Sequence, residues 1–297
     1  MATERVDKGW QQRGIDCYPV EAIIGTLAHY GVKIDEASFK AAAAEHFPLA
    51  IAMKWHEGWK GTGQFSRFPA AAAEELWRRL LPGQIAPTDV ALAVINLMKD
   101  LADLLDEKKD QGTLETRFKV VEAYLPSIPP PPRRDLFIGE LIGALNDWME
   151  PLDGMGEALA KKKHDALADR FVAIEEALIS QRKGVASAIV QAQRGDRDGA
   201  VRAFSAIALD SQRDFWNRLS ALDALLDFEE NELAKQAALP LFDDAEKSKD
   251  LELVSSVIER LAHLLEVDPA MPERKALRER IERLAAELGP GDEDEDA

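Results

Sequence analysis

The stretch "LELVSSVIERLAHLLEV", residues 251–267, shows the pattern that decides the fold class. Its apolar residues recur in steps of three and four, at Leu251, Val254, Ile258, Leu261 and Leu265. This spacing places them on one stripe of an α-helix, because a helix turns once every 3.6 residues. The stretch therefore predicts an amphipathic helix that packs against a core.

The same spacing extends over most of the chain. It continues toward the C-terminus at Leu277, Ile281, Leu284 and Leu288, and it is found in the middle of the chain at Phe137, Leu141, Leu145 and Trp148. In the N-terminal half it predicts helices near residues 19–30, 35–46, 69–81, 88–108 and 114–124. Asp35 is the expected cap of the second of these helices, and Thr88 or Asp89 of the fourth. The composition, richer in Ala and Leu than in β-branched residues, agrees with an all-α fold.

A run of prolines divides the helical pattern. The sequence "PSIPPPPRR", residues 126–134, lacks backbone donors and favours extended geometry, so we expect a linker there. It separates a helical N-terminal domain, residues 1–125, from stacked antiparallel helical hairpins over residues 135–289. The acidic residues 290–297 are expected to form a disordered, solubilising tail.

One segment of the C-terminal half resembles a known repeat. In "RGDRDGAVRAFSAIALD", residues 194–210, Gly195, Ala200 and Phe204 match the turn, small-residue and aromatic positions in the second helix of a tetratricopeptide repeat. The segment 257–272, ending in Asp268-Pro269, is similar to the same helix of a later repeat, although Ala200 and Val257 lie further apart than the ~34 residues of a regular array. The resemblance spans roughly residues 184–288. It implies an irregular tetratricopeptide-like stack whose concave face binds another protein.

Charge and cysteine content exclude several classes of protein. The 54 acidic and 37 basic residues give a net charge of −17, which disfavours nucleic acid as a partner. The longest stretch without a charged residue, residues 22–32, has eleven residues and is too short for a membrane span. A single cysteine and the absence of a secretory leader pattern predict a cytoplasmic, bacterial-type protein.

Cys17 is the candidate nucleophile. The sequence "QQRGIDCYPVEAIIGTLAHYG", residues 11–31, places it at the expected start of a helix, where the helix dipole favours a thiolate. Gln12, Asp16-Cys17 and Tyr30-Gly31 resemble the start of papain-like peptidase domains that process bacteriocin leaders. That resemblance implies a catalytic thiol assisted by Gln12.

Such a peptidase also needs a histidine base, and none of the five histidines stands in an apolar strand before an Asp or Asn partner. Tyr18 also replaces the small residue that follows the family's cysteine. We therefore expect Cys17 to be a buried or half-buried structural residue and keep a Cys17-dependent enzyme as the alternative.

The one long irregular segment, residues 47–69, is rich in aromatic residues. Residues 49–55 are expected to form a short strand, and the glycines that follow a loop. The candidate binding residues of this segment are Trp55, His56, Trp59, Phe65 and Arg67, because aromatics and arginine are common anchors of interfaces. The alternative is that the tryptophans fill the core between helices.

The sequence contains no metal or nucleotide signature. It has no pair of histidines at helical spacing and no Glu-x-x-His motif, and Gly61-Thr-Gly63 lacks the rest of a phosphate-binding loop. We therefore expect no metal and no cofactor. The sequence predicts a non-enzymatic adaptor or regulator that binds a protein partner. A structural subunit of a larger assembly is a further alternative, and the oligomeric state stays open.

Overall fold

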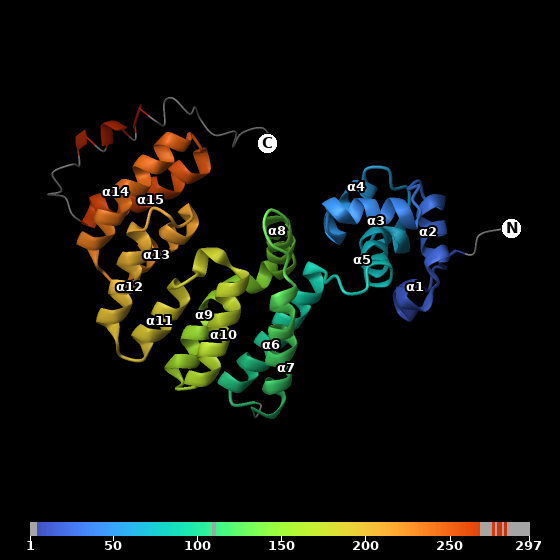
Figure 1. Cartoon of the computed structure of the whole chain (residues 1–297), viewed down its shortest axis with the longest axis horizontal. Coiled ribbons are helices and arrows are strands. Elements are labelled where there is room, and N and C mark those ends of the chain that lie inside the picture. Colours follow the sequence, from blue (N-terminus) through green and yellow to red (C-terminus); the bar gives the residue numbers. More distant parts are fainter. Residues whose placement is uncertain (1–4, 109–110, 268–274, 277, 281, 284–297) are drawn as a thin grey trace. The chain divides into compact units, whose positions relative to one another are not determined.

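The structure, a computed structural model, describes residues 5–108, 111–267, 275–276, 278–280 and 282–283 (Figure 1). Within these residues every regular element is helical, with fifteen α-helices joined by short turns and 3-10 segments. The predicted all-α fold class is confirmed. Contacts divide the chain into two compact units, unit 1 (Met1–Leu152) and unit 2 (Asp153–Ala297).

Unit 1 is a bundle of helices around an aromatic core. Its helices are α1 (Trp10–Arg13), α2 (Val20–His29), α3 (Glu36–Glu45), α4 (Pro48–His56), α5 (Phe68–Leu80), α6 (Pro87–Leu105), α7 (Leu114–Tyr124) and α8 (Arg133–Leu145). The largest fully buried side chains of the unit are those of Trp77, Phe39, Phe68, Phe118 and Phe137. Burial of such large rings supplies most of the hydrophobic stabilisation of a bundle.

Helix starts confirm one cap prediction and correct another. Asp35 caps α3 in a reciprocal capping box, accepting from the backbone N–H of Ser38 at 2.7 Å while the hydroxyl of Ser38 accepts from the backbone N–H of Asp35 at 2.9 Å. Helix α6 begins at Pro87, so Thr88 and Asp89 lie inside its first turn and neither is the cap. Proline starts a helix readily because its fixed φ is helical and its missing N–H is not needed there.

The predicted strand at residues 49–55 is wrong, because these residues form helix α4. Pro48 occupies the first position of the helix. The carboxylate of Glu140, on α8, accepts hydrogen bonds from the backbone N–H groups of Leu49 (3.1 Å) and Ala50 (2.9 Å). These two donors have no partner inside the helix, so a side chain far along the chain completes its N-terminus.

The proline-rich segment 126–134 lies inside unit 1. It connects α7 to α8, and α8 packs against α6. Arg133, at the start of α8, donates to the backbone carbonyl of Ala43 at 2.6 Å, and its guanidinium lies 4.8 Å from the ring centroid of Phe47. These contacts hold α8 against the N-terminal helices, and the boundary between the two units follows at Leu152.

Unit 2 is a stack of antiparallel helices. They are α9 (Met149–Lys161), whose first residues belong to unit 1, α10 (Asp165–Leu178), α11 (Val185–Gln193), α12 (Arg197–Leu209), α13 (Phe215–Asp227), α14 (Asn231–Ser248) and α15 (Leu251–Val267). From α10 onward each helix packs against the next, and from α11 onward each also packs against the next but one. The core between them is built mainly from Ala, Leu and Val side chains, with Phe204 and Phe242 as its largest buried members.

The turns of unit 2 repeat. Lys163, Gly195 and Glu229 have positive φ values of 61°, 96° and 59°. Each follows an odd-numbered helix and is bracketed by the same backbone hydrogen bond, His164 N to Leu159 O, Asp196 N to Gln191 O and Glu230 N to Leu225 O. This is the six-to-one bond of a helix C-terminus that closes on a left-handed residue. Unit 2 therefore contains three successive hairpins, α9–α10, α11–α12 and α13–α14.

The residues of the predicted repeat take ordered places in this stack. Ala200 and Phe204 are fully buried in α12, and Ala234, one hairpin further along the chain, is fully buried in α14. Val257 lies in α15, which packs against both α13 and α14 and so continues the series of odd-numbered helices. Its match to the second helix of a later repeat stays a prediction.

Two predictions fall outside the described residues. They concern the Asp268-Pro269 stop and the acidic tail at residues 290–297. All four positions of the apolar pattern at Leu277, Ile281, Leu284 and Leu288 lie outside the described residues as well. Among the helices that the structure describes, none combines the length and the apolar character needed to cross a membrane.

Candidate functional site

Two of the predicted binding residues form part of the core. Phe65 is only 6% exposed, and Trp59 is half-buried. The indole of Trp59 stacks on the ring of Phe68 with 6.0 Å between centroids, and its Nε1 donates to the carbonyl of Phe65 at 3.0 Å. Tyr30 contacts both residues, with centroid distances of 5.1 and 5.0 Å. These side chains fill the space between α2 and α5, as the alternative interpretation of the segment predicted.

The other three predicted binding residues do not join this cluster. Trp55 is half-buried on α4 and packs against Phe39 at 6.1 Å. His56 is exposed at the end of α4, and Arg67 is exposed directly before α5. The structure therefore brings Trp59 and Phe65 together and leaves Trp55, His56 and Arg67 as separate surface or boundary positions.

Cys17 lies before the helix, not within it. It ends a short 3-10 turn, Ile15–Cys17, and α2 starts at Val20 after Pro19, so the expected position in the first helical turn is wrong. The thiol is exposed, which also corrects the expectation of a buried cysteine, and its Sγ donates to the carbonyl of Arg13 at 3.0 Å. Within the described part of the chain no hydrogen bond joins Cys17 to a histidine.

The odd-numbered helices of unit 2 share a row of polar contacts. On α9, Glu157 accepts from the side-chain amide of Gln193 on α11 at 2.9 Å, and Lys161 pairs with the same carboxylate at 2.6 Å. On α13, Asp223 receives two hydrogen bonds from the guanidinium of Arg260 on α15, at 2.8 and 3.0 Å. These side chains connect the first helices of successive hairpins.

Asp227 lies within electrostatic reach of both parts of the row, because Asp223 and Glu157 both act on it. It is exposed at the C-terminal end of α13, and among the described residues it has no hydrogen-bonding or ion-pair partner. Partial burial raises its pKa, and the nearby carboxylates of Asp223 and Glu157 raise it further. We call the set Glu157, Gln193, Asp223, Asp227 and Arg260 the polar row. A cation placed beside the Asp227 carboxylate would relieve its repulsion by the neighbouring carboxylates.

Two polar pairs, each with one deeply buried member, join successive helical segments of unit 2. Arg218, 4% exposed, donates to Asp244 at 2.8 Å and so joins α13 to α14. Glu175 on α10, 1% exposed, accepts from Arg182 at 2.9 Å, just before α11. Burial raises the pKa of Glu175 to about 7, although the Arg182 guanidinium acts in the opposite direction. Such buried pairs fix geometry more than they add stability.

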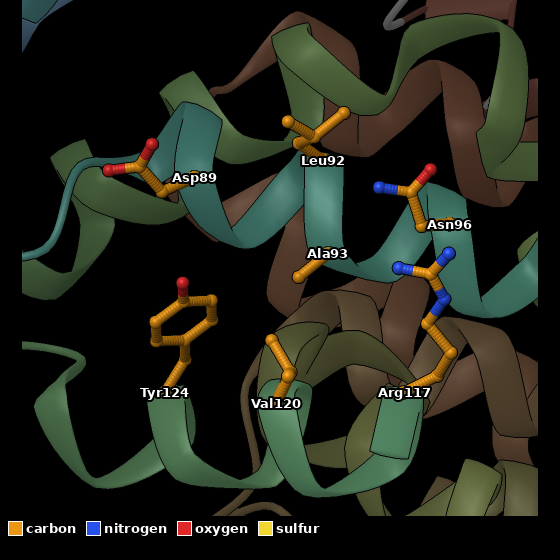
Figure 2. A pocket seen from close by; sticks show the side chains of 7 residues that line it. All are labelled: Asp89, Leu92, Ala93, Asn96, Arg117, Val120 and Tyr124. Carbon is orange, nitrogen blue, oxygen red and sulfur yellow. The ribbon is translucent and has the colours of Figure 1, made fainter. Parts of the chain in front are cut away.

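A second surface feature is a groove in unit 1 between α6 and α7 (Figure 2). It encloses about 200 Å³ and is lined by Asp89, Leu92, Ala93, Asn96, Arg117, Val120 and Tyr124. Leu92 and Val120 are 60% and 41% exposed, so the groove carries large aliphatic side chains from both helices that are open to solvent. We call it the α6–α7 groove.

Neither the polar row nor the groove was predicted from the sequence, although the sequence carries a signal for the groove. Leu92 lies off the buried stripe of α6, which consists of Val90, Ala91, Val94, Leu97, Met98 and Leu101. An aliphatic residue outside such a stripe faces solvent.

Within the described residues, no three or more His, Cys, Asp or Glu side chains are arranged to hold a metal ion. In comparisons with known proteins, no protein-family model, curated protein or solved structure matches the chain. The assignment of function therefore depends on the geometry of the two units.

Proposed function

We propose that this protein is a non-enzymatic adaptor or regulator that binds a segment of another protein along the polar row of unit 2. The observation that carries the proposal is the set of polar side chains on the odd-numbered helices: Glu157 and Gln193 join α9 to α11, Asp223 and Arg260 join α13 to α15, and the Glu157 and Asp223 carboxylates both act on Asp227. In stacked helical hairpins the first helices of successive pairs line one surface, which gives an extended segment several neighbouring helices to contact.

The dimensions of the hairpins support a tetratricopeptide-like stack. The left-handed turn residues Lys163, Gly195 and Glu229 recur at close to the ~34 residues that are the period of this repeat class. Small buried side chains at Ala200 and Ala234 let the paired helices approach closely. Stacks of this architecture bind partners on an extended concave surface. The single cysteine fits a reducing compartment such as the cytoplasm.

Charge favours a basic partner segment. The row carries three carboxylates, at Glu157, Asp223 and Asp227, and within the chain Arg260 pairs with Asp223 and Lys161 with Glu157. A lysine, an arginine or a free amino terminus placed beside Asp227 would gain an ion pair without breaking an existing one.

The test is selection of peptides from a displayed library of random short sequences, with the full-length protein as bait. The proposal predicts that the selected peptides are enriched in lysine and arginine. Asp227→Asn should weaken the best of them about fivefold, corresponding to about 1 kcal/mol for an ion pair at a partly exposed site.

Asp198→Asn is the matched control. Asp198 is exposed on α12, a second helix, and its substitution removes the same single charge. Affinity should stay within twofold of the wild-type value. Equal weakening by both variants would show that only the overall net charge matters, and selection of acidic or purely apolar peptides would refute the proposed partner.

A further inference from the structure

The α6–α7 groove has the size of a side chain. Its volume of about 200 Å³ is below the ~300–1,000 Å³ typical of sites for drug-sized ligands and cofactors. Val120 and Tyr124 extend from α7 toward α6, and Ala93 points from α6 into the space between them (Figure 2). The groove can therefore accept one branched aliphatic group between Ala93 and Val120, with Leu92 at its rim.

The two ends of the groove differ in charge. Asp89 and Tyr124 stand at one end, and Asn96 and Arg117 at the other (Figure 2). Asp89 also lies 3.5 Å from Arg78, and Arg117 uses its Nε to bond Asp100 at 3.0 Å. A carboxylate accepts several hydrogen bonds and a guanidinium has five N–H donors, so each group can take a further partner.

The spacing of these ends fits a helix. Asp89 and Asn96 are seven residues apart on α6, about 10 Å along its axis. A second helix lying along α6 covers that length with residues i and i+7, and residue i+4 lies between them on the same face. Helices that dock in grooves use this set of anchor positions.

We propose that the α6–α7 groove docks an amphipathic helix of a partner protein that presents a basic residue, a branched aliphatic residue and an acidic residue at positions i, i+4 and i+7. The basic residue faces Asp89 and Tyr124, the aliphatic side chain enters between Ala93 and Val120 and contacts Leu92 at the rim, and the acidic residue faces Asn96 and Arg117. This site belongs to unit 1 and does not depend on binding at the polar row.

The probe is a hydrocarbon-stapled, alanine-rich helical peptide with Lys, Leu and Glu at i, i+4 and i+7. It is added at millimolar concentration to full-length protein with labelled Leu and Val methyl groups, and methyl NMR spectra are recorded. The methyl signals of Leu92 and Val120 should shift, whereas those of Leu209 and Leu251, which are also exposed, should not. Leu92→Asp should weaken binding at least tenfold, and Leu251→Asp should leave it unchanged.

Two control experiments and the main experiment each have a result that would contradict the proposal. A peptide with alanine in place of both Lys and Glu should bind at least fivefold more weakly, and equal binding would refute the charge assignment. Free leucine at the same concentration should leave both methyl signals in place; a shift would mean that the groove takes a small molecule. If the stapled peptide leaves Leu92 and Val120 unshifted, the groove is not a docking site for this kind of helix.

Discussion

Alanine substitutions at two glycines of unit 2 test the repeated turn, because they are expected to change the stability of the unit in opposite directions. Gly195 has φ +96°, whereas Gly154 lies inside α9, and at both positions an added Cβ would meet no heavy atom within 4 Å. Steric crowding therefore does not distinguish them. Gly195→Ala places an L-residue in left-handed backbone and should destabilise unit 2 by about 1 kcal/mol. Gly154→Ala removes a flexible residue from a helix interior and should stabilise it by about the same amount.

The assay is amide hydrogen exchange of the full-length protein, followed in peptides that cover residues 185–227. A change of about 1 kcal/mol in the free energy of unfolding alters the exchange rate of the most protected amides about fivefold. Gly195→Ala should accelerate their exchange by that factor, and Gly154→Ala should slow it. If Gly195→Ala slowed exchange as much as Gly154→Ala, the left-handed turn between α11 and α12 would not exist and the hairpin period would lose its basis.

Two further predictions concern carboxylates. The pKa of Glu175 in the folded protein is raised to about 7 from an ordinary 4.5, so folding takes up a proton at pH values between 4.5 and 7. The free energy of unfolding therefore has its full contribution from Glu175 below pH 4.5 and loses it as pH rises through 7. Glu175→Gln should remove this decline, about 3 kcal/mol at most, in urea unfolding curves between pH 5 and 8; an identical decline in the variant would refute the assignment. Glu140→Ala should leave two backbone amide donors of α4 without their acceptor and destabilise unit 1 by about 1 kcal/mol, with faster amide exchange at Leu49 and Ala50. Glu140→Gln keeps an acceptor and should lose less stability. Unchanged amide exchange in Glu140→Ala would contradict the proposed cap.

Local spacing was enough to predict most helices of unit 1. Helices α2, α3, α5 and α7 begin and end within two residues of their predicted bounds, because their apolar stripes and the Asp35 cap are local signals. Helix α4 was missed because part of its N-terminal cap is Glu140, which lies four helices further along the chain, on α8. No short window of sequence contains that partner.

The candidate site was harder to predict for a related reason. The sequence does not show whether an aromatic residue such as Trp59 lies in a core or in an interface. In the structure, the indole of Trp59 stacks on Phe68, which places it at the core. The sequence around Cys17 predicts a helix that begins there, whereas in the structure Pro19 directly precedes α2 and leaves Cys17 outside it. The polar row consists of side chains from four helices, so it becomes visible only once the hairpins are stacked.

Carboxyl footprinting tests the central claim most directly. The full-length protein, alone and with a basic peptide selected by it, is treated with a carbodiimide and an amine, and the modification of each Asp and Glu is measured by mass spectrometry. Binding along the polar row predicts that Asp227 and Glu157 become protected while Asp198 and Glu232, on second helices, react as before. Unchanged reactivity of Asp227 with the peptide bound, or protection confined to the second helices, would contradict the account.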